Sequence, residues 1–174
     1  EARFCGLDFE VDERVLVPRS PIGEMIEQAF APWLPQTPES ILDLCTGSGC
    51  IAVACACAFP DADVDAADID DGAIEILRRN LKRHGLEDRI VVRHGDLFAP
   101  VGNARYDLIV SNPPYVPTGE WQALSDEYRH EPRIALDAGE DGMAIVDPTA
   151  EDGLSFVALP ARRMHFALAG DPGD

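Results

Sequence analysis

The sequence predicts an α/β fold built on a doubly wound parallel sheet. One observation is that short apolar segments with strand character alternate with segments of helical periodicity from about residue 40 to residue 110. This order is typical of consecutive β–α–β units. A second observation is that 174 residues, 46% of them hydrophobic, are enough for one substantial core. No run approaches the roughly 18 apolar residues of a membrane span, so we expect no membrane partner.

The N-terminal part is expected to form a short β-hairpin, a helix and a linker. Residues 4–17 alternate in polarity like two short strands joined near Asp12. Ser20 and Pro21 suit the N-cap and the first position of a helix. The segment 31–38 contains three prolines and is predicted to be a linker.

The core is expected to begin directly after this linker. Strands are predicted at residues 40–44, 64–67, 89–92 and 106–110, and helices at 51–59 and 72–84. Gly85 follows the second of these helices at the position that favours a left-handed cap. Because strands and helices alternate, we expect helices on both faces of a parallel sheet. The predicted division is into residues 1–38, a core of residues 39–146, and an atypical tail of residues 147–174.

The tail does not continue the β–α–β pattern. LSFVAL (154–159) and MHFALA (164–169) could form two strands, but they are too close in sequence for a parallel crossover. The C-terminal strands of the sheet are therefore expected to be missing or altered. A sheet of only four strands would leave an apolar edge exposed.

Charge and cysteine content narrow the functional classes. The chain has 32 Asp and Glu against 14 Lys and Arg, a net charge of −18. This field repels phosphate backbones and attracts a basic protein, although an acidic surface kept for solubility would have the same composition. The five cysteines lack the spacing and the histidine partners of a metal site. We expect buried thiols in a reducing, cytoplasmic compartment, with no metal and no disulfide.

A glycine-rich turn follows the first core strand. Gly47 and Gly49 allow a tight turn and close approach of the backbone to a ligand. Asp68, 21 positions after Gly47, has the spacing at which an acidic residue meets ribose hydroxyls. The turn matches neither GxGxxG nor a P-loop, and Asp43 would repel phosphate. A nucleoside carrying a cationic methionine group fits better, which describes S-adenosylmethionine. An ordinary strand-to-helix turn is the alternative.

A second acidic residue follows the third core strand. Asp96 could accept a hydrogen bond from an adenine amino group, with Leu97 or Phe98 against the ring. The alternative is that Asp96 only solvates its loop.

The fourth core strand ends in an unusual segment, SNPPY. The Asn112 side-chain carbonyl and the Pro113 backbone carbonyl offer two acceptors for the N–H bonds of a planar NH₂ group. Tyr115 offers a flat face for stacking. Pro113 and Pro114 remove backbone donors and rotational freedom. We therefore expect a clamp for an NH₂ group, with Asn112, Pro113 and Tyr115 as catalytic residues, rather than a plain strand-ending turn.

Together these motifs resemble the HemK/PrmB group of protein-glutamine methyltransferases, which have the Rossmann-like class I S-adenosylmethionine-dependent fold. The resemblance covers residues 4–146 and is carried by FCGLDFEVDERVLVPRSPIGEMIE, DLCTGSGCIA and SDEYRHEPRIALDAGEDGM. NPPY alone is shared with adenine-amino methyltransferases acting on nucleic acid. The longer segments resemble the PrmB branch, which modifies a glutamine of the third large-subunit ribosomal protein. The release-factor branch tends to have PRPDTE and DLGTGSG instead.

The resemblance also implies roles for individual residues. The implied cofactor site comprises Asp43, Thr46, Gly47, Gly49, Asp68, Asp96, Leu97 and Asn112. The implied substrate site comprises Asn112, Pro113, Pro114, Tyr115 and Arg19, with Glu131 and Pro132 in a later loop. Arg19 could instead be a surface cation.

The expected reaction is methylation of a glutamine side-chain amide in a basic ribosomal protein, with a release factor as the less expected substrate. The alternatives are an adenine-amino methyltransferase acting on nucleic acid and a truncated chain without activity. The sequence does not indicate an oligomeric state.

Overall fold

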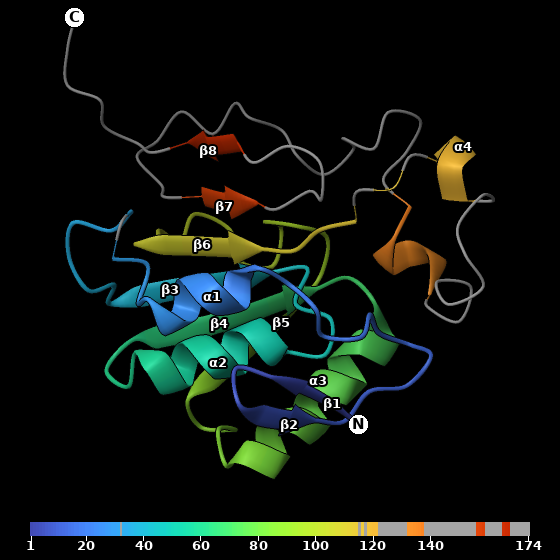
Figure 1. Cartoon of the computed structure of the whole chain (residues 1–174), viewed down its shortest axis with the longest axis horizontal. Coiled ribbons are helices and arrows are strands. Elements are labelled where there is room, and N and C mark those ends of the chain that lie inside the picture. Colours follow the sequence, from blue (N-terminus) through green and yellow to red (C-terminus); the bar gives the residue numbers. More distant parts are fainter. Residues whose placement is uncertain are drawn as a thin grey trace, which may run out of the picture.

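The chain folds around a six-stranded sheet with an N-terminal hairpin beside it (Figure 1). In this computed structural model the described residues are 1–31, 33–114, 116, 118–121, 132–137, 156–158 and 165–167. The strands are β1 (Ala2–Phe4), β2 (Leu7–Phe9), β3 (Ser40–Leu44), β4 (Asp63–Asp68), β5 (Ile90–His94), β6 (Leu108–Ser111), β7 (Phe156–Ala158) and β8 (His165–Ala167). The helices are α1 (Ile22–Glu27), α2 (Cys50–Ala58), α3 (Asp71–His84), α4 (Thr118–Trp121) and the 3₁₀ helix η2 (Arg133–Ala135).

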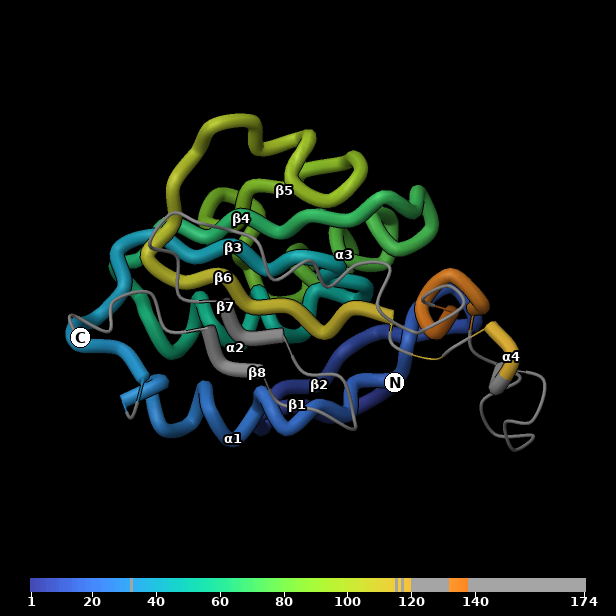
Figure 2. The backbone as a smooth tube through the Cα atoms, turned by 90° about the horizontal axis from the view of Figure 1, so that it is seen from above, coloured from blue at the N-terminus to red at the C-terminus, as the bar shows by residue number. Residues whose placement is uncertain are grey.

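The order of the strands fixes which face each connection covers. The sheet runs β5-β4-β3-β6-β7-β8, and all neighbours are parallel except β7 and β8. From β3 to β5 the chain moves steadily to one side, so right-handed crossovers place α2 and α3 on the same face. It must then cross back over β4 and β3 to reach β6. The returning segment, residues 95–107, and α1 lie on opposite sides of the strands (Figure 2).

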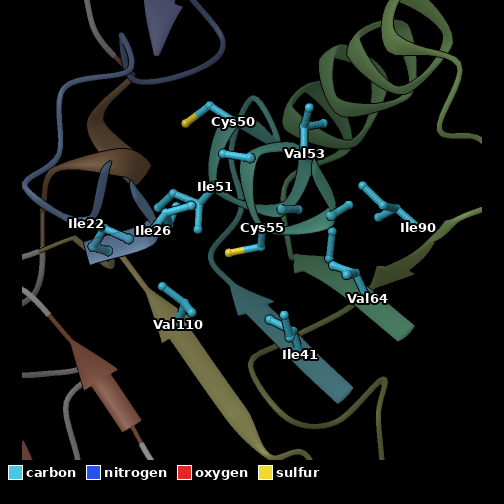
Figure 3. Packing of buried hydrophobic residues seen from close by; sticks show 14 of the residues in the cluster. Ile22, Ile26, Ile41, Cys50, Ile51, Val53, Cys55, Val64, Ile90 and Val110 are labelled. Carbon is cyan, nitrogen blue, oxygen red and sulfur yellow. The ribbon is translucent and has the colours of Figure 1, made fainter. Parts of the chain in front are cut away.

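Each face of the sheet has its own apolar layer, because successive strand side chains point to opposite faces. Ile41, Val64 and Val110 pack with residues of α1 and α2 in the larger layer (Figure 3). Leu42 and Ile109, the chain neighbours of Ile41 and Val110, pack with Tyr106 and the 95–107 segment on the second face. α2 is almost entirely buried, as its nearly continuous apolar sequence predicts.

The Rossmann-like α/β fold is confirmed, with one difference in how the second face is covered. In the part of the chain that the structure describes, α1, α2 and α3 all lie on the first face. The segment 95–107 covers the second face with turns rather than a helix. It is short, and Gly95, Pro100 and Gly102 interrupt any helical run.

The predicted core elements are present within a few residues of their expected bounds. α3 is capped as predicted at its C-terminus, where Gly85 has φ 66° and its N–H donates to the carbonyls of Leu81 and Lys82. At the other end, the Asp70 side chain accepts from the N–H of Ala73 at 2.8 Å. The division of the chain into three parts stays a prediction.

The predicted position of the hairpin turn, near Asp12, is wrong. The turn lies at Cys5 and Gly6, which have φ values of 47° and 76°. Two successive left-handed residues form the type of two-residue turn that matches the twist of the flanking strands. The apolar residues further along, such as Val15, instead belong to an arm, residues 10–20, that runs beside α3.

The tail contributes two strands to the sheet, as the sequence suggested. β7 pairs parallel with β6, and β8 pairs antiparallel with β7, which the short connection permits. The condition for an exposed apolar edge, a sheet of only four strands, does not arise at β6, because β7 pairs with it along residues 109–111.

Candidate active site

A cavity of about 320 Å³ opens at the carboxyl ends of β3, β4 and β6. Its walls come from loops and strand ends: residues 14–20 of the arm, the turn after β3 (44–48), the end of β4 (67–70), residues 95–97, Asn112, Pro114, Ile134 and Ala135. Cys50 and Ile51 of α2 and Ala73 of α3 complete the lining. This is the edge at which open α/β sheets bind ligands, because the loops and helix N-termini meet there.

The glycine-rich turn is held tightly between the sheet and α3. The Thr46 N–H donates to the carbonyl of Ala67 at 3.0 Å, which ties the turn to β4. Gly49 has φ 80°, and a Cβ at this position would collide with Leu77 of α3. Gly47, at φ 55°, has no atom within 4 Å of where a Cβ would lie and faces the cavity. Gly47 therefore lines the site, whereas Gly49 allows α2 to pack close to α3.

Asp43 lies beneath this turn rather than in the cavity wall. Its side chain is fully buried, and Oδ2 accepts from the Thr46 hydroxyl at 2.5 Å and the Ala52 N–H at 3.0 Å. Oδ1 has no hydrogen-bond partner among the described residues. Burial, together with the charge of Asp68, raises the pKa of Asp43 to about 7 despite the lowering effect of those two bonds. The carboxyl group thus supports the turn from below.

Asp68 links the end of β4 to the glycine turn. Its Oδ2 accepts from the Gly47 N–H at 2.8 Å and its Oδ1 from the Asp70 N–H at 3.0 Å. Burial raises the pKa of Asp68, and the backbone bonds from Asp70 and Gly47 oppose that effect. Each oxygen keeps a lone pair for a further donor, so the carboxylate is both oriented and able to bind a ligand.

The segment after β5 forms the next part of the wall. Asp96 and Leu97 both line the cavity, and the Gly95 N–H holds them near β4 by donating to the Asp68 carbonyl at 2.9 Å. Phe98 is 43% exposed and does not line it. Of the two predicted ring partners, only Leu97 lies at the cavity.

The Asn-Pro-Pro segment forms the opposite wall. Asn112 and Pro114 line the cavity, whereas Pro113 is buried and outside the lining. The preceding strand end is fixed because the Ser111 hydroxyl donates to the Leu44 carbonyl at 2.7 Å. Tyr115 lies outside the described residues.

The remaining residues predicted for the substrate site are Arg19, Glu131 and Pro132. Arg19 is exposed and lines the cavity. Pro132 directly precedes η2, whose Ile134 and Ala135 line the cavity. Glu131 lies outside the described residues.

Apart from Arg19, sequence reasoning missed the arm as a cavity wall. Arg14 in this arm donates to both carboxylate oxygens of Asp12 and, at 2.8 Å, to Glu75 of α3. Asn80 of α3, fully buried, accepts from the Glu10 N–H at 2.7 Å and donates to the carbonyls of Glu10 and Ser48 at 3.0 and 2.9 Å. A polar Asn80 amid apolar helix positions was the one sequence signal for this contact.

In the described ranges, no helix has the length and apolar character needed to cross a bilayer. Those same ranges contain no group of three or more His, Cys, Asp or Glu side chains suited to a metal ion. All five cysteines are free thiols.

The fold and the cavity define a Rossmann-like domain with a ligand cavity at the carboxyl ends of its strands. The chain is similar in structure to the hMettl16 catalytic domain in its complexes with MAT2A 3'UTR hairpins 6 and 1, with TM-scores of 0.63 and 0.64. Both comparisons give 18% identity and cover 88% of this chain, and 61% and 60% of the human chain. At this identity the likeness shows the fold alone.

Sequence comparison assigns the family. A family model described as the methyltransferase small domain matches residues 27–130, and the chain belongs to this family. Relatives named ribosomal protein uL3 glutamine methyltransferase are 45% identical in Bordetella pertussis, 46% in Francisella tularensis and 52% in Bradyrhizobium diazoefficiens. These alignments cover 97%, 82% and 81% of this chain but 60%, 46% and 47% of the relatives. They confirm the predicted resemblance to the PrmB branch, and the chain spans about half the length of these relatives.

Proposed function

We propose that the chain carries the catalytic site of an S-adenosylmethionine-dependent methyltransferase that modifies a glutamine of ribosomal protein uL3. The observation that carries the proposal is that one cavity joins the Asp68 wall to the Asn112 wall. The proposed nucleoside site and the proposed amide site would thus share a single space. The names of the curated relatives supply the reaction and the acceptor.

The residues of the cavity fit this cofactor, which supplies a methyl group on a positively charged sulfur. Asp68 keeps lone pairs for ribose hydroxyls, and Asp96 with Leu97 would take the adenine. The open space above Gly47 leaves room for the methionine part. Buried Asp43, whose Oδ1 has no partner among the described residues, lies beneath this turn, and its ionised form would favour a cation over a phosphate.

The acceptor chemistry rests on positioning. An amide nitrogen is a poor nucleophile because its lone pair is delocalised. The Asn112 side-chain carbonyl and the Pro113 backbone carbonyl would accept its two N–H bonds, which directs the nitrogen and increases its electron density. Among the described lining residues there is neither a histidine nor a lysine. The site would therefore act through orientation and electrostatics rather than a general base.

The acceptor is expected to be a basic protein. The net charge of −18 attracts such a partner and opposes nucleic acid as a substrate. We propose uL3 ahead of a release factor because the relatives are named for uL3. Free thiols fit a reducing cytoplasmic location.

Asn112→Ala tests the proposal directly. We expect methyl transfer to uL3 to fall by about 10²-fold or more, while the cofactor Kd, measured by calorimetry, changes only a few-fold. Asp68→Ala should instead weaken cofactor binding. An equal loss of binding and turnover in Asn112→Ala would contradict the role of Asn112 in holding the amide.

Methylation and cofactor-binding assays on the unsubstituted chain distinguish the proposed function from its two alternatives. Methylation of DNA or RNA in place of uL3 would favour an adenine-amino methyltransferase. Failure of the parent chain to bind the cofactor at all would favour a truncated chain without activity.

A further inference from the structure

A second, more open hollow adjoins the cavity. It has a volume of about 520 Å³ and is lined by Thr118, Arg133, Ile134 and Asp137. Ile134 also lines the main cavity, so its side chain forms the ridge between the two spaces. A polypeptide segment bound in the second hollow would therefore border the cavity that Asn112 lines.

The ridge is held in place by a compact set of bonds. Asp137 accepts from the Thr118 hydroxyl at 2.6 Å through one oxygen and from Arg133 at 2.9 Å through the other. The Val116 N–H donates to the Leu136 carbonyl at 2.8 Å, which joins the chain beyond Pro114 to the segment after η2. Val116 and Leu136 are buried. A contact residue on such a braced segment is pre-organised for binding.

Ile134 is exposed at the cavity, as are Ile69 at 51% and Val17 at 40%, but of these three only Ile134 also lines the second hollow. Its exposed fraction is 52%, the largest among the exposed large hydrophobic residues of the described part of the chain. Val91 on β5 has a similar fraction, 49%, but lines neither hollow. Single exposed apolar residues are common, but Ile134 sits at the mouth of a site.

The charge of the hollow indicates what it can accept. Arg133 and Asp137 bond each other at 2.7 Å, so the lining carries one positive and one negative charge. On a chain with a net charge of −18, the described lining of this hollow carries no net charge. Basic residues of an acceptor would be drawn to the surrounding acidic surface, whereas a neutral, partly apolar hollow suits an uncharged side chain.

We propose that Ile134 is a specificity-determining contact for the acceptor protein, and that the hollow beside it receives an uncharged residue adjoining the target glutamine. The inference rests on the proposed function, since it deepens the description of the same site. It assigns to this segment a role in recognising the acceptor rather than the cofactor.

Ile134→Ser tests this assignment, with Val91→Ser as a control of matched exposure and unchanged net charge. With uL3 as acceptor and saturating cofactor, we expect KM for uL3 to rise on the order of ten-fold in Ile134→Ser, as for loss of a half-buried aliphatic contact. We expect kcat and the cofactor Kd to change less than about three-fold. Val91→Ser should match the parent, and Ile134→Val should recover most of the affinity.

Each outcome decides the inference. An unchanged KM in Ile134→Ser, or an equal rise in Val91→Ser, would overturn it while leaving the proposed function intact. A parallel loss of cofactor affinity would assign Ile134 to the cofactor and also overturn it. If the parent chain does not methylate uL3, the proposed function fails and this inference fails with it.

Discussion

The buried Asp43 predicts a specific dependence of stability on pH. Its pKa is raised from 3.8 to about 7 in the folded chain, mainly by burial. Below about pH 4 the carboxyl is protonated in both the folded and the unfolded chain, so its titration does not lower the free energy of unfolding. Between pH 4 and 7 the unfolded chain releases the proton and the folded chain keeps it, so the free energy of unfolding falls as pH rises. Above pH 7 the carboxyl is ionised in both states, and the free energy of unfolding is lowered by the full amount.

The magnitude follows from the two values. About 3 pH units at about 1.4 kcal/mol each give a ceiling of roughly 4 kcal/mol. Asp43→Asn removes this titration, and its side-chain carbonyl can still accept from Thr46 and Ala52. We therefore expect Asp43→Asn to gain stability relative to the parent between pH 5 and pH 8, by an amount approaching that ceiling.

Urea unfolding followed by circular dichroism at several pH values measures the effect. Asp63→Asn, at an exposed position on β4, controls for the loss of one negative charge from an already acidic chain. A stability difference between Asp43→Asn and the parent that stays constant from pH 5 to pH 8 would refute the reasoning.

Two further substitutions address the supports of the cavity. Gly49→Ala places a Cβ against Leu77 and should lower the free energy of unfolding by about 1–3 kcal/mol. Gly102→Ala, also at positive φ but in open space, isolates the collision, and equal losses in the two would argue against it. Asn80→Leu loses three hydrogen bonds and leaves Glu10 and Ser48 groups without partners, so we expect a loss of roughly 2–4 kcal/mol in urea unfolding. A loss below about 1 kcal/mol would mean that these groups find other partners.

The sequence predicted the central sheet because its signals are local. Periodicity located α2 and α3, and the left-handed Gly85 marks a helix end that the sequence alone indicates. The glycine turn and Asp68 were recognisable because their spacing reflects a β–α–β unit, and the structure brings them within one hydrogen bond.

What the sequence could not show depends on contacts between distant residues. The arm after β2 alternates in polarity like a strand, yet its bonding partner is Asn80, 70 positions from Glu10. No local pattern signals such a pair. The pairing of β6 with β7 is similarly non-local, since it joins residue 109 to residue 156. Ile134 gave no signal of its own, because its importance arises from the meeting of two hollows.

The walls of the cavity come from segments spread between residue 14 and residue 135. No single element of the fold carries the whole cavity, so it exists only when the sheet, the arm and η2 have come together. A ligand of this cavity therefore binds the folded chain and not its pieces, and its binding free energy adds to the stability of the entire unit, by about 2.7 kcal/mol at a concentration 100 times Kd. The supply of ligand in the cell would then set how long the chain survives proteolysis, even at cleavage sites far from the cavity.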